Sequence, residues 1–434
     1  MGPITLFDKS FLQSLSTDES VWFDNFFYPV VAPLFIIETL ADLYKKPREG
    51  KTAEDEVGII AAKTPQLHGG PCHFHVNLYI SDLLGNHVPL TGQVPIAGMR
   101  RVVKDGQEGA VLEVTPEARA FSRWQEGQFQ VLERFQGRAW RMQVENSDLS
   151  AIEQRMKQLG VDRKTCKTID DALKLADEMI AGLTKSPGRF DVMLQALDVP
   201  DEARPHVKAR WKRKGHAPLA TFAPYARHVL RVQLFFQIAL GANLIASTRA
   251  SHKVDIAYLF YLPFCSLFVS SDRLHRLCAP LFLRADQEFV WGPGLKPELA
   301  ALNTHFAALP EGTRKQGIYA FASRLPDESQ GLIRALFARH TPNLLRPAAA
   351  VGMPNMDPEK HKALVDQVKS WTKAPAAGAF AGNSAAAAGG LQSMVIKRAI
   401  SRTRGSWTMI SDEVAARSRA AEADEMRRRR LRLR

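Results

Sequence analysis

The chain has 434 residues, of which 45% are hydrophobic and 24% charged, a composition typical of a globular protein with two or three domains. Lys and Arg outnumber Asp and Glu by 58 to 45, and the net charge of +13 favours a polyanionic partner, because basic side chains displace counterions from phosphates. Polar residues or proline interrupt the most apolar stretches, 229–245 and 256–269, and the four cysteines are scattered, which excludes membrane spans and a disulfide framework. With no secretory signal, we expect a cytoplasmic protein without a membrane partner.

The first 45 residues alternate strand and helix signals. Ile4 to Phe7 is a short apolar, β-prone run that ends at Asp8 and predicts a buried strand. A short helix over 10–15 and a second helix that ends near Phe27 follow, and prolines then interrupt the chain. Residues 34–44 predict another helix, in which Glu38 is the lone interior acid.

Residues 46–224 predict an inserted domain made of a hairpin plus helices. Residues 45–56 are charged and typical of a loop. Apolar residues alternate over 73–80, which predicts a half-buried strand, and 88–99 suits its return strand. Helices are expected over 111–132, 149–159 and 168–183, and 204–214 is strongly basic.

The rest of the chain predicts a return to strands and then a helical region. A long apolar helix over 229–245 is followed by a helix over 255–262 and a strand over 266–269, after which come Ser270, Ser271 and Asp272. Residues 296–372 predict a helical region. Residues 373–434 predict a low-complexity linker and a basic tail that offers a surface for a protein partner.

Isolated acids fall where a parallel α/β sheet binds its ligands. Asp8 and Asp272 follow predicted strands, and the carboxyl ends of parallel strands open onto a crevice. Asp255 opens a helix that is otherwise apolar, and Glu38 lies in an apolar helical stretch, where an ionised acid is costly unless it is compensated. A hard divalent cation, Mg²⁺ or Mn²⁺, would compensate these carboxylates.

This order of elements resembles a PIN-like nuclease domain. The matching segments are LFDKSFLQSL, FIIETLADL and VDIAYLFYLPFCSLFVSSDRLH. The resemblance implies an α/β fold, with a three-layer core around a central parallel sheet formed by residues 1–45 and 225–295, interrupted by the large mixed α+β insertion. It implies a metal-dependent nuclease that acts on nucleic acid, RNA rather than DNA, with Asp8, Glu38, Asp255 and Asp272 as catalytic acids and ligands of Mg²⁺ or Mn²⁺. Ser271 would help to position the phosphate.

Each acid also has a structural interpretation. Asp8 and Asp255 suit helix caps, Asp272 suits a turn, and Glu38 has possible partners in nearby cations. The alternative is therefore a non-catalytic nucleic-acid-binding or interaction protein on a degenerate PIN-like core. Convergence of the four carboxylates favours the nuclease, whereas acids that are capped or paired apart favour the alternative.

Two basic segments are candidates for substrate binding. Cations flank the last two acids and could clamp the scissile phosphate or balance the acids. A second run mixes cations with an indole that could stack on a base, or it is a solvated basic loop. The candidates are Arg249, His252, Lys253 and Arg273 in the first segment, where His275 also flanks the acids, and Arg210, Trp211, Lys212 and Arg213 in the second. A further group, His68, Cys72, His73 and His75, offers too few convergent ligands for zinc and favours the polar face of a hairpin.

Overall fold

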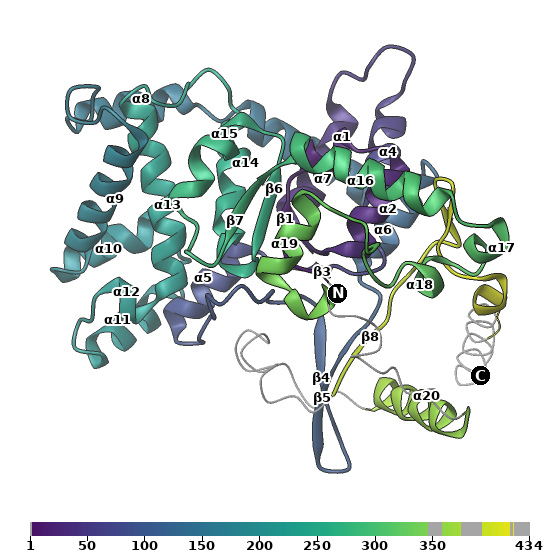
Figure 1. Ribbon diagram of the computed structural model, residues 1–434. Helices are drawn as coiled ribbons and strands as arrows, with labels where there is room; N and C mark the ends of the chain where they lie inside the picture. The colour runs from purple at the N-terminus through teal and green to yellow at the C-terminus, as the bar shows by residue number, and fades with distance from the viewer. Residues whose placement is uncertain (1, 346–357, 375–392, 417–419, 421–434) are drawn as a thin grey trace.

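Five parallel strands form the centre of the computed structural model, which describes residues 2–345, 358–374, 393–416 and 420 (Figure 1). The strand order is β3 (Gly70–Pro71), β2 (Tyr28–Val31), β1 (Ile4–Phe7), β6 (Leu267–Ser270) and β7 (Glu288–Trp291). β1 lies in the middle because its apolar and β-branched residues are suited to burial on both faces. Thr5 lies opposite Pro29 on one side and Leu267 on the other. This pairing confirms that segments far apart in the sequence share one parallel sheet.

Helices cover both faces of this sheet. Successive residues of a strand point to opposite faces, and accordingly Leu6 packs into one hydrophobic core and Phe7 into another. The first core contains α5 (His75–Leu84) and α13 (Pro224–Gly241), and the second contains α2 (Thr17–Phe26) and α16 (Gly292–Ala307). In Figure 1 these two sets of helices lie to the left and to the right of the strands. The fold is therefore α/β with a central parallel sheet.

The helices that follow the strands begin at the carboxyl edge of the sheet. α1 (Lys9–Ser14) follows β1, α15 (Arg273–Cys278) follows β6, and α16 follows β7. The expected helix around Glu38 is present as α3 (Pro33–Ala41), extended by the 3-10 turn η1 (Asp42–Tyr44), and α4 (Ala53–Lys63) comes next. The helix expected before Pro263 is present as α14 (His252–Ala257) and the 3-10 helix η2 (Tyr258–Phe264).

The hairpin of the inserted segment lies later in the chain than the sequence predicted. Residues 75–84 form the helix α5 instead of a strand, and the hairpin consists of β4 (Met99–Lys104) and β5 (Gln107–Leu112). The prediction of one helix over 111–132 is also wrong, because β5 occupies its start and the helices are α6 (Pro116–Gln125) and α7 (Val131–Glu145). The helical part that follows comprises α8 (Leu149–Gln158), α9 (Ile169–Leu183), α10 (Pro187–Ala196), α11 (Arg204–Arg213) and α12 (Leu219–Phe222).

The region after the sheet is largely helical. Its elements are the 3-10 turn η3 (Ala279–Leu281), α17 (Glu311–Arg314), α18 (Ile318–Phe321), α19 (Leu332–His340), the 3-10 turn η4 (Pro342–Leu345) and α20 (Pro358–Lys373). No described helix has both the length and the apolar character needed to cross a membrane.

Part of the segment expected to be linker and tail packs onto the body. β8 (Ser393–Ile396) pairs in parallel with β5, and β9 (Thr403–Arg404) pairs with β10 (Trp407–Thr408). Trp407 is buried and donates from its indole N–H to the Asn303 side chain at 2.8 Å, while its ring meets that of Trp22 edge-on. The low-complexity linker 375–392 and the terminal arginines after residue 420 lie outside the described residues.

Candidate functional site

Four acids from separate elements lie at or near the carboxyl edge of the central sheet. Asp8 directly follows β1, and Asp272 comes two residues after the end of β6. α3 carries Glu38, and α14 carries Asp255. Burial, helped by the negative charges of Glu38, Asp272 and Asp8, raises the pKa of Asp255 to about 7 against the lowering effect of His275. Each of the other three acids is thus close enough to act on Asp255.

The carboxylate of Asp8 is buried and held by several donors. One oxygen caps α1 by accepting from the Phe11 N–H at 3.0 Å, and the other accepts from Ser10 Oγ at 2.5 Å and Ser270 Oγ at 2.9 Å. His275 Nδ1 lies 3.4 Å from the second oxygen. Burial alone would raise the pKa of Asp8, but the hydrogen bond and charge of His275, with the bonds from Ser10 and Phe11, lower it. Asp8 is therefore ionised and fixed in position.

His275 links three elements at this edge. Its Nδ1 lies 2.8 Å from Ser270 Oγ, and its Nε2 lies 2.6 Å from the Asp255 carbonyl oxygen. Burial lowers the pKa of His275, but the neighbouring Asp8 more than offsets this and raises it to about 9. The imidazolium and Asp8 thus form a buried ion pair that ties β1 and α15 to α14.

Glu38 lies beside a second cation, Lys9. Tyr258 donates to Glu38 Oε2 at 2.6 Å, and Lys9 Nζ lies 3.8 Å from Oε1. Lys9 also donates to Asp42 Oδ2 at 2.9 Å, one helical turn beyond Glu38. Burial raises the pKa of Glu38 despite the opposing effects of Lys9 and Tyr258, and the charges of Asp8 and Asp42 add to the rise. The side chain of Glu38 remains 22% exposed, so it is accessible from solvent.

Asp255 and Asp272 differ in how they are held. Asp272 caps α15 by accepting from the Leu274 N–H at 2.6 Å, whereas its structural interpretation had been a turn. Asp255 lies in the first turn of α14 rather than at its cap, and within the described residues no donor reaches its carboxylate. Asp255 is therefore the least compensated of the four acids.

The cluster contains more negative than positive charge. Four carboxylates, those of Asp8, Glu38, Asp42 and Asp255, share the two cations Lys9 and His275, and the charge of Asp272 also acts on Asp255. Buried charge without a counter-ion is costly, so the surplus favours protons or an added cation. Carboxylate oxygens are the donors that Mg²⁺ and Mn²⁺ prefer, and the donor set fits these ions in kind and in charge.

The side chains have the chemistry to bind a metal ion, but they do not converge on one point. Among residues 2–345, 358–374, 393–416 and 420, no three His, Cys, Asp or Glu side chains stand close enough together to hold a metal ion. Asp8 and Asp272 are committed to helix caps, and Lys9 contacts Glu38 from the side of Asp42. A bound ion at this edge would therefore require the acids to turn toward it.

The other residues predicted near the last two acids fall into two groups. Arg249, Lys253 and Arg273 are exposed, and none has a carboxylate partner within the described part of the chain. His252 is buried instead, with Nδ1 3.0 Å from the Ala246 carbonyl, and burial lowers its pKa. Ser271 Oγ is buried against Gly292 and has no hydrogen-bond partner in the described residues. The three exposed cations are available to a polyanion, and His252 is not.

The two central residues of the basic segment on α11 make contacts within the protein. The indole of Trp211 was a candidate for stacking on a base, with a solvated basic loop as the alternative. The segment is instead a helix in which Trp211 is buried, its ring lies 4.0 Å from that of Phe190, and its N–H donates to the Ala217 carbonyl. Arg210 donates to backbone carbonyls of α5 and of Phe222. These two assignments to substrate binding are therefore wrong. The exposed Lys212 and Arg213 remain available.

The His68 group does not form a hairpin face. Cys72 is buried, and the His73 N–H donates to the Pro95 carbonyl at 3.0 Å. The ring of His75 packs between Phe260 and Phe74, and burial lowers its pKa to about 4. His68 meets Tyr319 edge-on. These residues contribute to packing at the start of α5 and beside β3.

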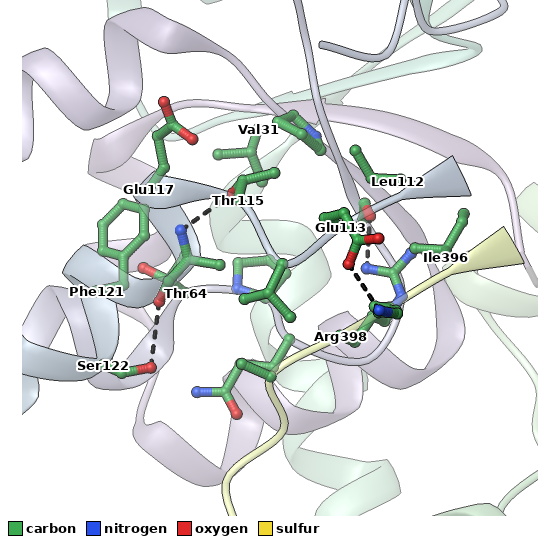
Figure 2. Close-up of a pocket in the computed structure, with 18 of the residues that line it drawn as sticks. Val31, Thr64, Leu112, Glu113, Thr115, Glu117, Phe121, Ser122, Ile396 and Arg398 are labelled. Carbon is green, nitrogen blue, oxygen red and sulfur yellow. Dashed lines mark hydrogen bonds and ion pairs between the residues drawn. The ribbon is translucent and has the colours of Figure 1, made fainter. Parts of the chain in front are cut away.

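A cavity of about 80 Å³ lies elsewhere, between the edge of the sheet and the C-terminal segment (Figure 2). Its walls come from β2, the loop after α4, the start of α6 and residues 396–399. Figure 2 shows Phe121 and Leu112 on opposite sides of the cavity. Lys397 Nζ lies 2.8 Å from the Glu113 carboxylate. None of the four acids lines it.

Sequence reasoning missed several members of the acidic cluster. Lys9 and Asp42 were not considered, and neither were the donors Tyr258 and Ser270. Asp42 was detectable, because it lies four residues after Glu38 and therefore on the same face of the helix. His275 was noted only as one of several flanking cations, since its contact with Asp8 depends on the pairing of β1 with β6.

Comparisons with family models, with curated proteins and with solved structures found no match to this chain.

Proposed function

We propose that the carboxyl edge of the central sheet is the active site of a PIN-like, metal-dependent nuclease that hydrolyses phosphodiester bonds in RNA. The observation that supports this most is the surplus of buried and half-buried carboxylates, with Asp255 the least compensated of them beside Asp8, Glu38 and Asp272. A structural role does not account for such a surplus, because unpaired buried charge destabilises a fold.

Asp8, Glu38, Asp255 and Asp272 would hold Mg²⁺ or Mn²⁺. When bound, such an ion stabilises negative charge on a phosphate and makes water a nucleophile near neutral pH. The chain contributes a rigid frame for these acids: Ser10, Ser270 and His275 fix Asp8, and Tyr258 fixes one oxygen of Glu38. A frame of this kind limits reorganisation during the reaction.

The exposed cations beside the acids would bind the nucleic-acid backbone. Arg249 lies just before the start of α14, Lys253 lies in its first turn, and Arg273 directly follows Asp272. Their guanidinium and ammonium groups suit phosphate oxygens. The net charge of +13 supports the same substrate class.

One observation favours a second candidate, a non-catalytic nucleic-acid-binding protein on a degenerate core of the same type. Asp8 and Asp272 both cap helices, and no three ligands converge in the described residues. In that case the acids stabilise helix ends and balance Lys9 and His275.

Cleavage of a labelled single-stranded RNA separates the two candidates. We expect the wild-type protein to cleave it with Mn²⁺ and to be inactive in chelator. Asp8→Asn should lower the rate of cleavage by at least about 100-fold, because the loss of a metal ligand removes several kcal/mol of charge stabilisation in the transition state. Asp170→Asn, an exposed acid on α9, is the matched control and should cleave like the wild type. RNA binding without cleavage across Mg²⁺, Mn²⁺ and Co²⁺ would establish the second candidate.

A further inference from the structure

A cationic pocket adjoins the acidic edge on the side of α1 and α4. Its cavity of about 130 Å³ is lined by Gln13, Asp42, Lys45, Lys46, Arg48 and Glu56, together with Pro47. Asp42 belongs to both places, because the carboxylate that lines the pocket also accepts from Lys9, the cation beside Glu38. Asp42 and Lys9 therefore connect the pocket to Glu38 at the acidic edge.

Charge in this pocket is unevenly compensated. Arg48 pairs with Glu56 through two of its guanidinium nitrogens, and Lys9 pairs with Asp42. Within the described residues, neither Lys45 nor Lys46 has a carboxylate partner, and both are exposed. The lining thus holds three cations against two acids, so the pocket is net positive, whereas the neighbouring edge has surplus negative charge.

The protein around the pocket adds to this positive potential. Lys63 is largely buried and donates to the Gln13 carbonyl at 3.0 Å, on the outer side of α1. Burial lowers its pKa, and the neighbouring cations Lys296 and Arg48 lower it further. Cations that lower one another's pKa favour the binding of an anion.

We propose that this pocket is a subsite for a backbone phosphate of the RNA, next to the phosphodiester that lies on the acidic edge, with Lys45 and Lys46 as its ligands. The subsite rests on the proposed nuclease function for its choice of RNA. Adjacent phosphates of one strand are spaced by a single nucleotide, so a strand whose scissile phosphate lies at the acids places a neighbouring phosphate beside Asp42. Arg48 and Glu56, which pair with each other, line one part of the pocket, and the two lysines provide the charge.

The test measures binding separately from cleavage. A fluorescein-labelled hexauridylate is titrated in chelator, by anisotropy, at several KCl concentrations between 50 and 300 mM. Lys45→Ala/Lys46→Ala should weaken binding about three- to ten-fold at 100 mM salt, and the slope of log K against log salt should fall in magnitude by about 0.7, the value for one phosphate contact to a single strand.

Matched controls and a second readout keep the failure of the subsite distinct from that of the nuclease. Lys164→Ala/Lys167→Ala removes two exposed lysines from the loop before α9 and should leave the slope unchanged.

Wild-type protein that cleaves RNA while Lys45→Ala/Lys46→Ala binds with wild-type affinity and slope would overturn the subsite alone. If Lys45→Ala/Lys46→Ala loses affinity as expected but the wild type never cleaves RNA, the result supports the subsite and contradicts the nuclease function. Displacement of the oligonucleotide by inorganic phosphate at equal ionic strength would show a pocket for free phosphate and overturn the proposal, as would a wild-type protein that does not bind the oligonucleotide.

Discussion

Replacement of Arg404 by Met is expected to destabilise the whole protein, although Arg404 lies in a C-terminal segment far from the core in sequence. Arg404 is 5% exposed, and its guanidinium donates to Asp24 Oδ2 at 2.9 Å, to Ser20 Oγ at 3.0 Å and to the carbonyls of Ala62 and Lys63. Asp24 is fully buried, so the substitution leaves an anion without its cation. Removing one partner of a buried ion pair costs about 3–5 kcal/mol.

That cost converts into a measurable shift of the melting temperature. An unfolding entropy of about 2.1 cal/mol/K per residue gives about 0.9 kcal/mol/K for 434 residues. The melting temperature of Arg404→Met should therefore fall by about 3–5 °C. Residual hydrogen bonds to Asp24 from the N–H groups of residues 66–68 keep the loss from being larger.

Thermal melting followed by circular dichroism tests this, with Arg402→Met as the matched control. Arg402 lies in the same segment, but its ion pair with Asp412 is exposed to solvent. Exposed pairs contribute at most about 1 kcal/mol, so the control should melt within about 1 °C of the wild type. If both variants melt alike, the C-terminal segment is not part of the cooperative fold and the reasoning is wrong.

Two further predictions concern pH and the basic helix. In chelator, stability should decline as pH rises from 6.5 to 9, because the stabilisation from His275 is complete below pH 6.5 and is lost as pH rises through about 9. Below pH 6.5 the raised pKa of Asp255, about 7 against 3.8, is opposed by the pKa values of His75 and His228, which burial lowers from 6.5 to about 4. Melting curves from pH 6.5 to 9 should show that His275→Gln removes most of this decline, and a wild-type profile that is flat or rising over that range would contradict the assignment. Arg210→Ala should lower the melting temperature clearly more than Lys212→Ala, because only Arg210 donates to buried backbone carbonyls. Equal melting of these two variants would restore Arg210 as a free surface cation.

The sequence predicted the strands that carry the acids, and the reason is local. Ile4–Phe7 and the run before Ser270 are short, apolar and rich in β-favouring residues, so their type is determined without knowledge of their partners. The order of Asp8, Glu38, Asp255 and Asp272 therefore placed four residues at the same edge. What it could not supply was the set of contacts across the sheet, such as that of His275 with Asp8.

Two errors have clear physical causes. Pro29 was taken as an interruption, yet it lies within β2. The Tyr28 N–H donates to Pro3 on the β1 side, so the ring of Pro29 faces the other side, where β3 pairs only from Val30 onward. Alternation over 73–80 was taken as a strand, but the buried residues of that segment and beyond, Leu78, Tyr79 and Leu83, have helical spacing.

The basic segment on α11 shows why a run of charged residues is a poor guide to a binding surface. Trp211 and Arg210 occupy the inner face of an amphipathic helix, where the indole packs on Phe190 and the guanidinium satisfies carbonyls. Their neighbours Lys212 and Arg213 occupy the outer face. A run of basic letters does not reveal this division, because the division depends on which face of the helix the fold buries.

The most direct measurement of the central claim compares melting curves of the wild type and Asp255→Asn with and without Mn²⁺. Asp255 is the informative position, because no donor within the described residues reaches its carboxylate and the substitution removes no helix cap. If the acids form a cation site, Asp255→Asn relieves repulsion from Glu38, Asp272 and Asp8 and melts higher than the wild type in chelator. Mn²⁺ should stabilise the wild type by about 2.7 kcal/mol at a hundred times its dissociation constant and stabilise the variant much less. A variant that melts lower in chelator and gains as much from Mn²⁺ as the wild type would contradict a metal site at this edge.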